Sequence, residues 1–361
     1  MRLINTQSLE LEEFVGNAIP KYAILSHTWE KEEVTFQEWH DRDSIANKAG
    51  YKKIVAACEQ ARADRLQYIW VDTNCIDKKS SAELSEAINS MFAWYAGSNC
   101  CYVYLADLVL STSSHAETTD PALIYWLDHG EQLRKCRWFS RGWTLQELLA
   151  PKTIIFFDAN WQRVGDIRDG WLRDQISKIT GIGAFHFGGT GILFKASVST
   201  RMSWAARRET TREEDIAYCL LGIFGINMPL LYGEGRRAFL RLQEELVRVS
   251  NDQTIFCWSF PSNCSLDKGW DNVLAPHPYV FSEGGKYDPN SLYNTGYSLT
   301  NNGLEITLPA IRIGERCSIA LLGANIEQDR LAIILERSGD LESRNYHERL
   351  RRIPPEVFQD G

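Results

Sequence analysis

Ser140, Trp143 and Glu147 are regularly spaced within the segment RWFSRGWTLQELLAP, and they are the residues most suggestive of chemistry in this sequence. In a helix, Trp143 and Glu147 fall on one face, one turn apart, so an indole and a carboxylate would line the same wall of a site. Such a carboxylate holds sugar hydroxyls or stabilises developing positive charge, and an indole stacks on a flat ring. The alternative is that Glu147 is a solvated helix residue, as most helical glutamates are.

A second group of polar residues follows two apolar runs. The first run ends at Ser26 and is followed by His27 and Trp29. The second run ends at Asp72 and is followed by Asn74. His27 suits the binding of phosphate or ribose, or acid–base work; the alternative is a loop histidine that hydrogen-bonds nearby backbone. Asp72 and Asn74 suit ribose hydroxyls, and equally suit the turn and the cap of the next helix.

Three weaker readings concern a thiol, two arginines and a metal. Cys75 with His27 and Asp72 has the composition of a nucleophile with its base and orienter, but no cysteine-protease signature surrounds it and a buried thiol is the commoner state. Arg137 and Arg141 are candidates for nucleotide phosphates, with surface ion pairs as the alternative. The histidines lack metal-ligand spacing, so we expect no structural metal.

The first half of the chain alternates short apolar runs with helically periodic segments, a pattern typical of a parallel sheet with crossover helices. Apolar faces predict helices over residues 51–61 and 84–95. The carboxyl ends of such strands open at one edge of the sheet, where ligands bind. The predicted strands, each nearly continuous in apolar residues, are Tyr22 to Ser26, Tyr68 to Asp72, Cys100 to Leu105 and Thr153 to Phe157.

Residues 107–136 interrupt this rhythm and are interpreted as an insertion. They contain the polar piece STSSHAETTD and a helix predicted around Tyr125 to Leu133. Farther along, Thr211 to Glu214 is typical of a capping box, and a helix is predicted from Arg236 to Val249. The GEG sequence at 233–235 lacks the context of a phosphate-binding loop and predicts a turn.

After Asn251 the sequence changes to short strand-like runs such as TIFCWSF, GLEITLPAI, CSIALLGA and RLAIILER, which predict a β-rich tail. The chain ends in PPEVFQDG without an obvious closing strand. We therefore expect an α/β domain over residues 1–200, a helical extension packed on it over 201–250, and a β-rich module over 251–361.

Composition narrows the class of protein. The 361 residues are 44% hydrophobic and 24% charged, which predicts a globular chain. A formal net charge of -8 and the lack of a basic stripe argue against nucleic-acid binding. The nine scattered cysteines include no C-x-x-C pair and predict reduced thiols. The first residues do not resemble a secretory signal, and the longest apolar stretch, Cys219 to Tyr232, is too short to span a membrane. We expect a cytoplasmic protein.

Four blocks stand out along the chain: YAILSHTW at 22–29, YIWVDTNCID at 68–77, AINSMFAWYAGSNCCYVYL at 87–105 and RWFSRGWTLQELLAP at 137–151. In this order they resemble the motif blocks of fungal heterokaryon-incompatibility (HET) domains. The stretch from Arg201 to Gly235 resembles the segment that commonly follows this domain. The resemblance implies a role in non-self recognition between fungal individuals that ends in growth arrest or cell death.

The order of strands and helices before S-x-x-W-x-x-x-E-L is also similar to TIR domains, in which a glutamate in a matching segment serves the cleavage of NAD between nicotinamide and ribose. This likeness implies a TIR/flavodoxin-like fold, Glu147 as the catalytic carboxylate, and NAD or a related nucleotide as substrate rather than cofactor. One carboxylate suffices because nicotinamide in NAD is already cationic and leaves without a general acid. The sequence departs from the TIR pattern at residues 27–29 and in the insertion before Trp143.

Together the two resemblances imply a cell-death effector that cleaves NAD or a related nucleotide. Expected partners are the nucleotide, further copies of the chain on activation and an upstream sensor protein. The alternative is a non-enzymatic signalling module that acts by homotypic self-association. The predicted site comprises catalytic Glu147 and the substrate-binding residues Ser26, His27, Trp29, Asp72, Asn74, Arg141 and Trp143.

Overall fold

The structure, a computed structural model, describes most of the chain. The chain forms two compact units, Met1–Leu193 and Phe194–Gly361, and each is described by itself. Within the described ranges, no helix has the length and apolar character needed to cross a membrane. The described residues are 1–110, 130–260, 270, 272–293, 295–301, 303–313, 317–338 and 349–352.

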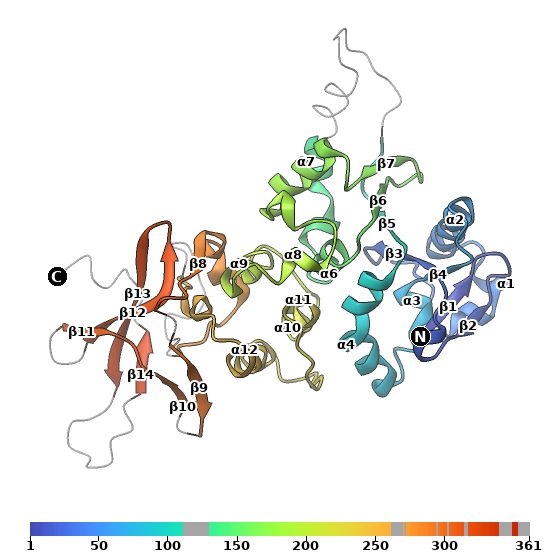
Figure 1. Ribbon diagram of the computed structural model, residues 1–361. Helices are drawn as coiled ribbons and strands as arrows, with labels where there is room; N and C mark the ends of the chain where they lie inside the picture. The colour runs from blue at the N-terminus through green and yellow to red at the C-terminus, as the bar shows by residue number, and fades with distance from the viewer. Residues whose placement is uncertain are drawn as a thin grey trace, which may run out of the picture. The chain divides into compact units, whose positions relative to one another are not determined.

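The first unit is built on a seven-stranded sheet with the order β2-β1-β4-β3-β5-β6-β7 (Figure 1). Its four central strands are parallel and lie 2-1-3-4 in chain order, the arrangement of flavodoxin-like folds. The predicted α/β fold with a mostly parallel sheet is therefore confirmed. The four strands are β3 (Tyr22–His27), β4 (Tyr68–Trp70), β5 (Cys100–Tyr104) and β6 (Ile154–Phe157).

Helices cover both faces of this sheet. The apolar periodicity correctly predicts α2 (Ala49–Ala63), between β3 and β4, and α4 (Ser81–Gly97), between β4 and β5. The second connection crosses back over β3, so right-handed crossovers place the two helices on opposite faces, as Figure 1 shows. The short helix α6 (Thr144–Leu149) packs against α4 and β3 and therefore belongs to the face that α4 covers.

The antiparallel edges of the sheet are not predicted from sequence, because their strands are short and mix polar with apolar residues. β4 ends two residues before its predicted end, since Asp72 already begins a short helix. Residues 130–135 are helical, whereas the rest of the predicted helix in the insertion lies outside the described residues. The remaining elements of this unit are β1 (Arg2–Asn5), β2 (Leu11–Glu13), β7 (Arg163–Asp166), α1 (Arg42–Ile45), α3 (Asp72–Cys75), α7 (Gly170–Thr180), α8 (Thr190–Leu193), and the 3-10 turns η1 (Gly16–Ala18), η2 (Glu38–His40), η3 (Arg137–Ser140) and η4 (Ala184–His186).

The second unit begins with helices, and one predicted cap there is wrong. α10 begins at Asp215, and Glu214 does not form a capping box. Its carboxylate instead accepts the backbone N–H groups of Gly233 and Gly235 over 2.7 and 3.1 Å, which holds the predicted GEG turn. Both glycines have positive φ, 104° and 56°, so the turn suits glycine. The helices are α9 (Val198–Ser203), α10 (Asp215–Tyr218), α11 (Leu221–Phe224) and α12 (Arg237–Val249).

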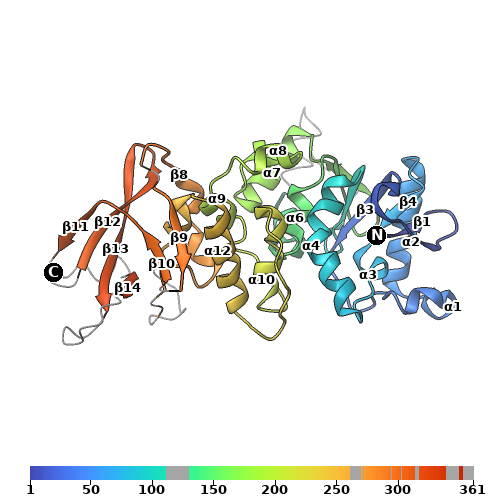
Figure 2. The same cartoon turned by 60° about the horizontal axis from the view of Figure 1, so that its bottom comes forward.

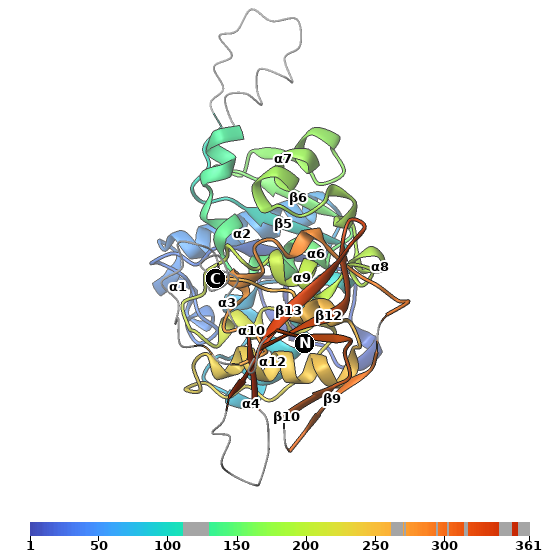
Figure 3. The ribbon, with the colours of Figure 1, turned by 90° about the vertical axis from the view of Figure 1, so that its left-hand side faces the viewer.

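The second unit continues into strands, which confirms the predicted β-rich tail. Its longest hairpin joins β12 to β13, and β9 pairs separately with β10 (Figures 2 and 3). The run TIFCWSF is not a strand: it begins with a 3-10 turn, because the Asp252 side chain accepts the N–H of Thr254 and caps it. The elements are η5 (Gln253–Phe256), η6 (Pro278–Phe281), η7 (Gly284–Lys286), β8 (Tyr287–Pro289), β9 (Tyr297–Thr300), β10 (Gly303–Ile306), β11 (Ala310–Ile313), β12 (Cys317–Ile326), β13 (Asp329–Ser338) and β14 (Arg349–Arg352).

The helices after residue 194 and the strands of the tail lie in the same compact unit. The predicted division into three parts at residues 200 and 250 stays a prediction. The final segment, PPEVFQDG, lies outside the described residues.

Candidate functional site

Glu147 lies in α6, a helix whose six residues are all buried. Leu145, Leu148 and Leu149 pack into the core, and Glu147 itself is only 7% exposed. This burial contradicts the alternative that Glu147 is a solvated helix residue. A carboxylate kept from water depends on its protein partners, so the groups around Glu147 decide what it can do.

Ser26 and Trp138 orient the Glu147 carboxylate. The Ser26 hydroxyl donates to Glu147 Oε2, and Trp138 Nε1 donates to Ser26 Oγ over 2.8 Å. An indole N–H can only donate, so the Ser26 oxygen accepts from Trp138 and directs its own hydrogen to the carboxylate. Ser26 and Trp138 are almost completely buried. These three residues, the Glu147 cluster, fix a carboxylate beside the carboxyl end of β3.

Two further buried groups lie next to this cluster. Tyr95 of α4 donates its hydroxyl to Leu25 O over 3.1 Å, and burial, with the Glu147 charge in addition, raises the pKa of Tyr95 well above its usual value. Cys101 of β5 lies with Sγ 4.0 Å from Glu147 O, and burial raises the pKa of this thiol as well. Both groups stay protonated and neutral, so neither supplies a competing base.

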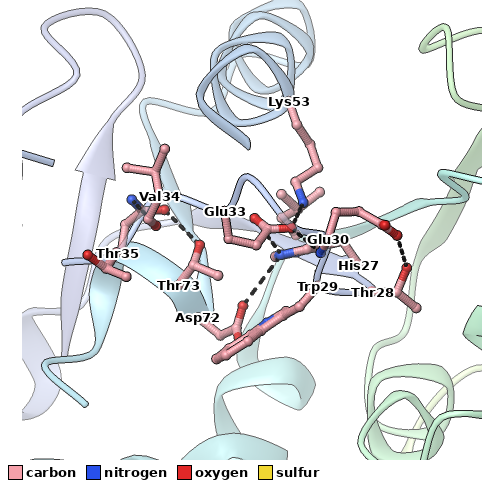
Figure 4. Close-up of polar contacts among 12 residues, drawn as sticks. His27, Thr28, Trp29, Glu30, Glu33, Val34, Thr35, Lys53, Asp72 and Thr73 are labelled. Carbon is pink, nitrogen blue, oxygen red and sulfur yellow. Dashed lines mark hydrogen bonds and ion pairs between the residues drawn. The ribbon is translucent and has the colours of Figure 1, made fainter. Parts of the chain in front are cut away.

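His27, the last residue of β3, faces the opposite side of the sheet from Ser26, because side chains alternate along a strand. Its side chain is 1% exposed, and its Nε2 lies 3.7 Å from Glu33 Oε2 and 3.8 Å from Asp72 Oδ1 (Figure 4). Neither ring nitrogen has a hydrogen-bond partner in the described part of the chain. Burial, followed by the charge of Lys53, lowers the pKa of His27 to about 3, so the imidazole is neutral near neutral pH.

Two lysines neutralise the carboxylates that face His27. Lys53 Nζ lies 2.5 Å from Glu33 Oε1, in a pair whose side chains are 6% and 10% exposed, and Lys78 Nζ lies 3.4 Å from Asp72 Oδ2. Burial works to raise the pKa of Asp72, but Lys78 and other positive neighbours outweigh it and lower that pKa overall. Both carboxylates are therefore paired, each through one oxygen.

Trp29 lies beside these charges and is 52% exposed. Its Nε1 donates to Asp72 Oδ2 over 2.9 Å, and Lys78 Nζ stands 3.3 Å from the ring centroid, a close cation–π contact. We call His27, Trp29, Glu33, Lys53, Asp72 and Lys78 the His27 cluster.

The loop after β3 reaches this cluster because Gly50 permits a close approach. A Cβ at Gly50 would lie 2.5 Å from Glu32 O, and the Gly50 N–H donates to that same oxygen over 3.0 Å. Asn74 ties the loop from the other side by donating from Nδ2 to Val34 O over 3.1 Å. Asn74 is fully buried and its amide is engaged with the loop, so its binding of substrate stays a prediction.

The predicted residues before α6 occupy different environments. Trp143 is half-buried and has helical dihedrals, so it stands one turn from Glu147. Arg141 is half-buried, and its contact with a substrate stays a prediction. Ser140 is exposed, and its hydroxyl donates to the backbone oxygen of Arg137 over 3.0 Å.

The weaker readings of Cys75 and Arg137 have structural explanations. Burial raises the pKa of the Cys75 thiol to about 12, and its sulfur accepts the N–H of Val71 over 3.4 Å. A thiol in this state is a poor nucleophile. The Arg137 guanidinium pairs with Glu30 and lies 3.6 Å from Asp107, the surface ion pairs that the sequence offered as the alternative.

The structure thus divides the predicted site residues between two faces of β3. Ser26 joins Glu147 on one face, whereas His27, Trp29 and Asp72 come together on the other. Among the described residues, no group of three or more His, Cys, Asp or Glu side chains is arranged to hold a metal ion. The sequence did not identify five residues of these surroundings, namely Glu33, Lys53, Lys78, Tyr95 and Trp138.

The neutral state of buried His27 predicts a loss of stability in acid. Below its ordinary pKa of 6.5 a histidine of the unfolded chain is protonated, whereas folded His27 stays neutral down to about pH 3. Protonation therefore favours the unfolded state, and stability that is present above pH 6.5 falls as the pH is lowered, by about 1.4 kcal/mol per pH unit.

Denaturant unfolding of the wild type and of His27→Gln checks this expectation. Between about pH 7 and pH 5 the wild type should lose about 2 kcal/mol more unfolding free energy than His27→Gln does. Replacement of the exposed His40 by Gln is the control and should leave the wild-type profile unchanged. Parallel profiles for the wild type and His27→Gln would contradict the neutral assignment.

Comparisons with known proteins relate the part of the chain that contains both clusters to a known family. The family model "Heterokaryon incompatibility protein (HET)" matches residues 22–147, a range that begins with β3 and contains both clusters. Vegetative incompatibility protein HET-E-1 of Podospora anserina is 46% identical over 231 residues, which is 63% of this chain and 16% of that protein. The chain therefore spans only a small part of this relative. No solved structure matches the chain.

Proposed function

This chain carries a heterokaryon incompatibility (HET) domain, and from that premise we propose that it is an effector of fungal non-self recognition whose activation arrests growth or kills the cell. The similarity to an incompatibility protein of Podospora anserina supports this role. The range that the family model matches, residues 22–147, contains β3, β4, β5 and α4 and ends at Glu147 in α6, so the proposed activity belongs to the first unit.

The effector acts by cleaving NAD or a related nucleotide at its N-glycosidic bond, with Glu147 as the catalytic carboxylate. The observation that carries this proposal is a buried carboxylate whose orientation is fixed by the Ser26 hydroxyl, itself oriented by Trp138. Preorganised groups stabilise charge in a transition state because they need no rearrangement when the charge develops. A surface glutamate would lack this property.

The position of the cluster also supports a nucleotide substrate. In open α/β sheets, ligands bind beyond the carboxyl ends of the strands where the strand order reverses. Here that reversal occurs at β3, which lies between β4 and β5. Ser26 is the penultimate residue of β3, so the Glu147 cluster lies close to that edge.

In the proposed reaction the bond between the ribose C1′ and the nicotinamide nitrogen breaks. Its electron pair goes to the ring nitrogen, which neutralises the cationic nicotinamide as it leaves. Glu147 stabilises the positive charge that develops on the ribose. Water then adds to C1′ and releases a proton, so the products are nicotinamide, ADP-ribose and one proton. No general acid is required, in contrast to ordinary glycosidases with two carboxyl groups.

Inducible expression of this chain in a fungal host tests the proposal. We expect the wild type to lower cellular NAD before growth stops, and Glu147→Gln at equal abundance to leave both NAD and growth unchanged. Growth arrest at constant NAD, with Glu147→Gln as toxic as the wild type, would instead support the non-enzymatic module that acts by self-association.

A further inference from the structure

Two carboxylate oxygens of the His27 cluster lie close to one point, His27 Nε2. His27 Nε2 lies 3.7 Å from Glu33 Oε2 and 3.8 Å from Asp72 Oδ1, distances too long for direct hydrogen bonds (Figure 4). His27 Nε2 and Glu33 Oε2 are buried and have no hydrogen-bond partner among the described residues. Buried polar atoms in folded proteins nearly always have a partner, so this point calls for a bridging group.

The charges around this point select a neutral group. The second oxygen of each carboxylate is already occupied, because Glu33 Oε1 pairs with Lys53 and Asp72 Oδ2 with Lys78 and Trp29. The two ammonium groups balance the two carboxylates, and burial keeps His27 uncharged. An additional cation would meet two lysines, and an anion would meet two carboxylates. A hydroxyl group can donate its one hydrogen to a carboxylate oxygen while it accepts from the N–H of the neutral imidazole.

Asp72 and Trp29 form the exposed side of the His27 cluster. The Asp72 side chain is 23% exposed and Trp29 is 52% exposed, whereas the side chains of His27 and Glu33 are buried. A larger molecule that brings a hydroxyl to Asp72 therefore approaches from this side, with the rest of that molecule beside the indole.

We propose that His27, Glu33 and Asp72 bind the hydroxyls of a second ribose, so that the substrate is a dinucleotide whose two sugars lie on opposite sides of the end of β3. This inference rests on the proposed function. Ser26 and His27 are consecutive and face opposite sides of the strand, so a ribose held at Glu147 leaves the His27 cluster free for another sugar. Carboxylates are established partners of the adenosine ribose hydroxyls in dinucleotide sites.

The same arrangement makes the subsite selective. A phosphate on the 2′-hydroxyl of the adenosine ribose would place negative charge against Glu33 and Asp72, whose lysines are already paired. NAD is therefore bound in preference to NADP. Removing the 2′-hydroxyl leaves the buried atoms unpartnered and also weakens binding.

Calorimetric titration of the full chain tests the subsite. Every protein in the titration carries Glu147→Gln, so that no ligand is consumed. We expect NADP and an NAD analogue lacking the adenosine 2′-hydroxyl each to bind roughly tenfold or more weakly than NAD. A second substitution, Glu33→Gln or Asp72→Asn, should weaken NAD binding by a similar factor. It should also reduce the ratio between the affinities for NAD and NADP. Glu38→Gln is the matched control, because Glu38 also pairs with a lysine, Lys48, at an exposed position, and should change nothing.

Two results would overturn the inference while leaving the proposed function standing. One is that the Glu147→Gln chain binds NAD, NADP and the deoxy analogue with equal affinity while the wild-type chain cleaves NAD. The other is NAD binding by the Glu33→Gln and Asp72→Asn chains that matches that of the Glu38→Gln chain, when circular dichroism shows that all three are folded under the conditions of the titration. If no nucleotide binds and the wild type cleaves none, both the inference and the proposed function fail.

Discussion

Glu147→Gln is expected to lower nucleotide cleavage by the purified chain roughly 10²- to 10³-fold, the usual effect of removing one preorganised group that stabilises transition-state charge. The glutamine keeps the shape of the side chain and an oxygen that accepts the Ser26 hydroxyl, so the hydrogen bonds within the cluster are retained. Only the negative charge opposite the developing oxocarbenium ion is lost. The fall should therefore appear mainly in kcat, with little change in substrate affinity.

Glu12→Gln is the matched control for this measurement. Glu12 is another carboxylate of the first unit that accepts a hydroxyl, that of Tyr68 over 2.9 Å, but it lies on the edge strand β2. We expect its variant to cleave nucleotide at the wild-type rate. Wild-type kcat in a folded Glu147→Gln chain would show that this carboxylate is not catalytic.

Lys53→Met is expected to destabilise the first unit by about 3–5 kcal/mol, because breaking a buried ion pair from one side leaves the other charge unpaired. Lys53 and Glu33 are 6% and 10% exposed and only 2.5 Å apart. Without the ammonium, the Glu33 carboxylate would face neutral His27 and the Asp72 carboxylate. Equilibrium unfolding in denaturant, followed by tryptophan fluorescence, measures the loss.

Two variants make this prediction specific. Lys48→Met removes the lysine of an exposed pair with Glu38, and we expect a cost of no more than about 1 kcal/mol. Lys53→Met combined with Glu33→Gln removes both buried charges and should recover much of the lost stability, since the cost comes from the unpaired charge. A Lys53→Met chain as stable as Lys48→Met would contradict the buried pair.

The fold of the central sheet could be predicted because its signals are local. Strand β3 is buried along its whole length and is correspondingly continuous in apolar residues, and α2 and α4 each have an apolar periodicity. The two wrong predictions in the second unit have different causes. Asp252 caps a 3-10 turn within a strand-like run, and Glu214 bonds to glycines about twenty residues away, which no spacing rule detects.

The candidate site could be predicted only in part. Glu147, Ser26, His27 and Asp72 were identified because they belong to motif blocks or to the ends of apolar runs. The division between the two faces of β3 follows from strand alternation, but only once the strand is known to extend to His27.

The residues that sequence reasoning missed carry weak signals. Lys53 lies in α2 directly after the exposed Lys52, so from sequence it is interpreted as a second surface charge. Glu33 lies in a polar loop, and its burial depends on the close approach that Gly50 permits. Trp138 stands in the same block as Glu147, but its hydrogen bond to Ser26 joins residues 112 positions apart. Such pairings are properties of the folded chain.

The central claim is that the Glu147 cluster cleaves the bond between nicotinamide and ribose. The most direct test is to mix the purified wild-type chain with NAD, at protein concentrations high enough for assembly, and to follow the mixture by proton NMR. The proposed reaction predicts that free nicotinamide and ADP-ribose appear in equal amounts as NAD disappears, and that Glu147→Gln prevents their formation. An unchanged NAD spectrum with the wild-type chain, or equal product from both proteins, would contradict the claim.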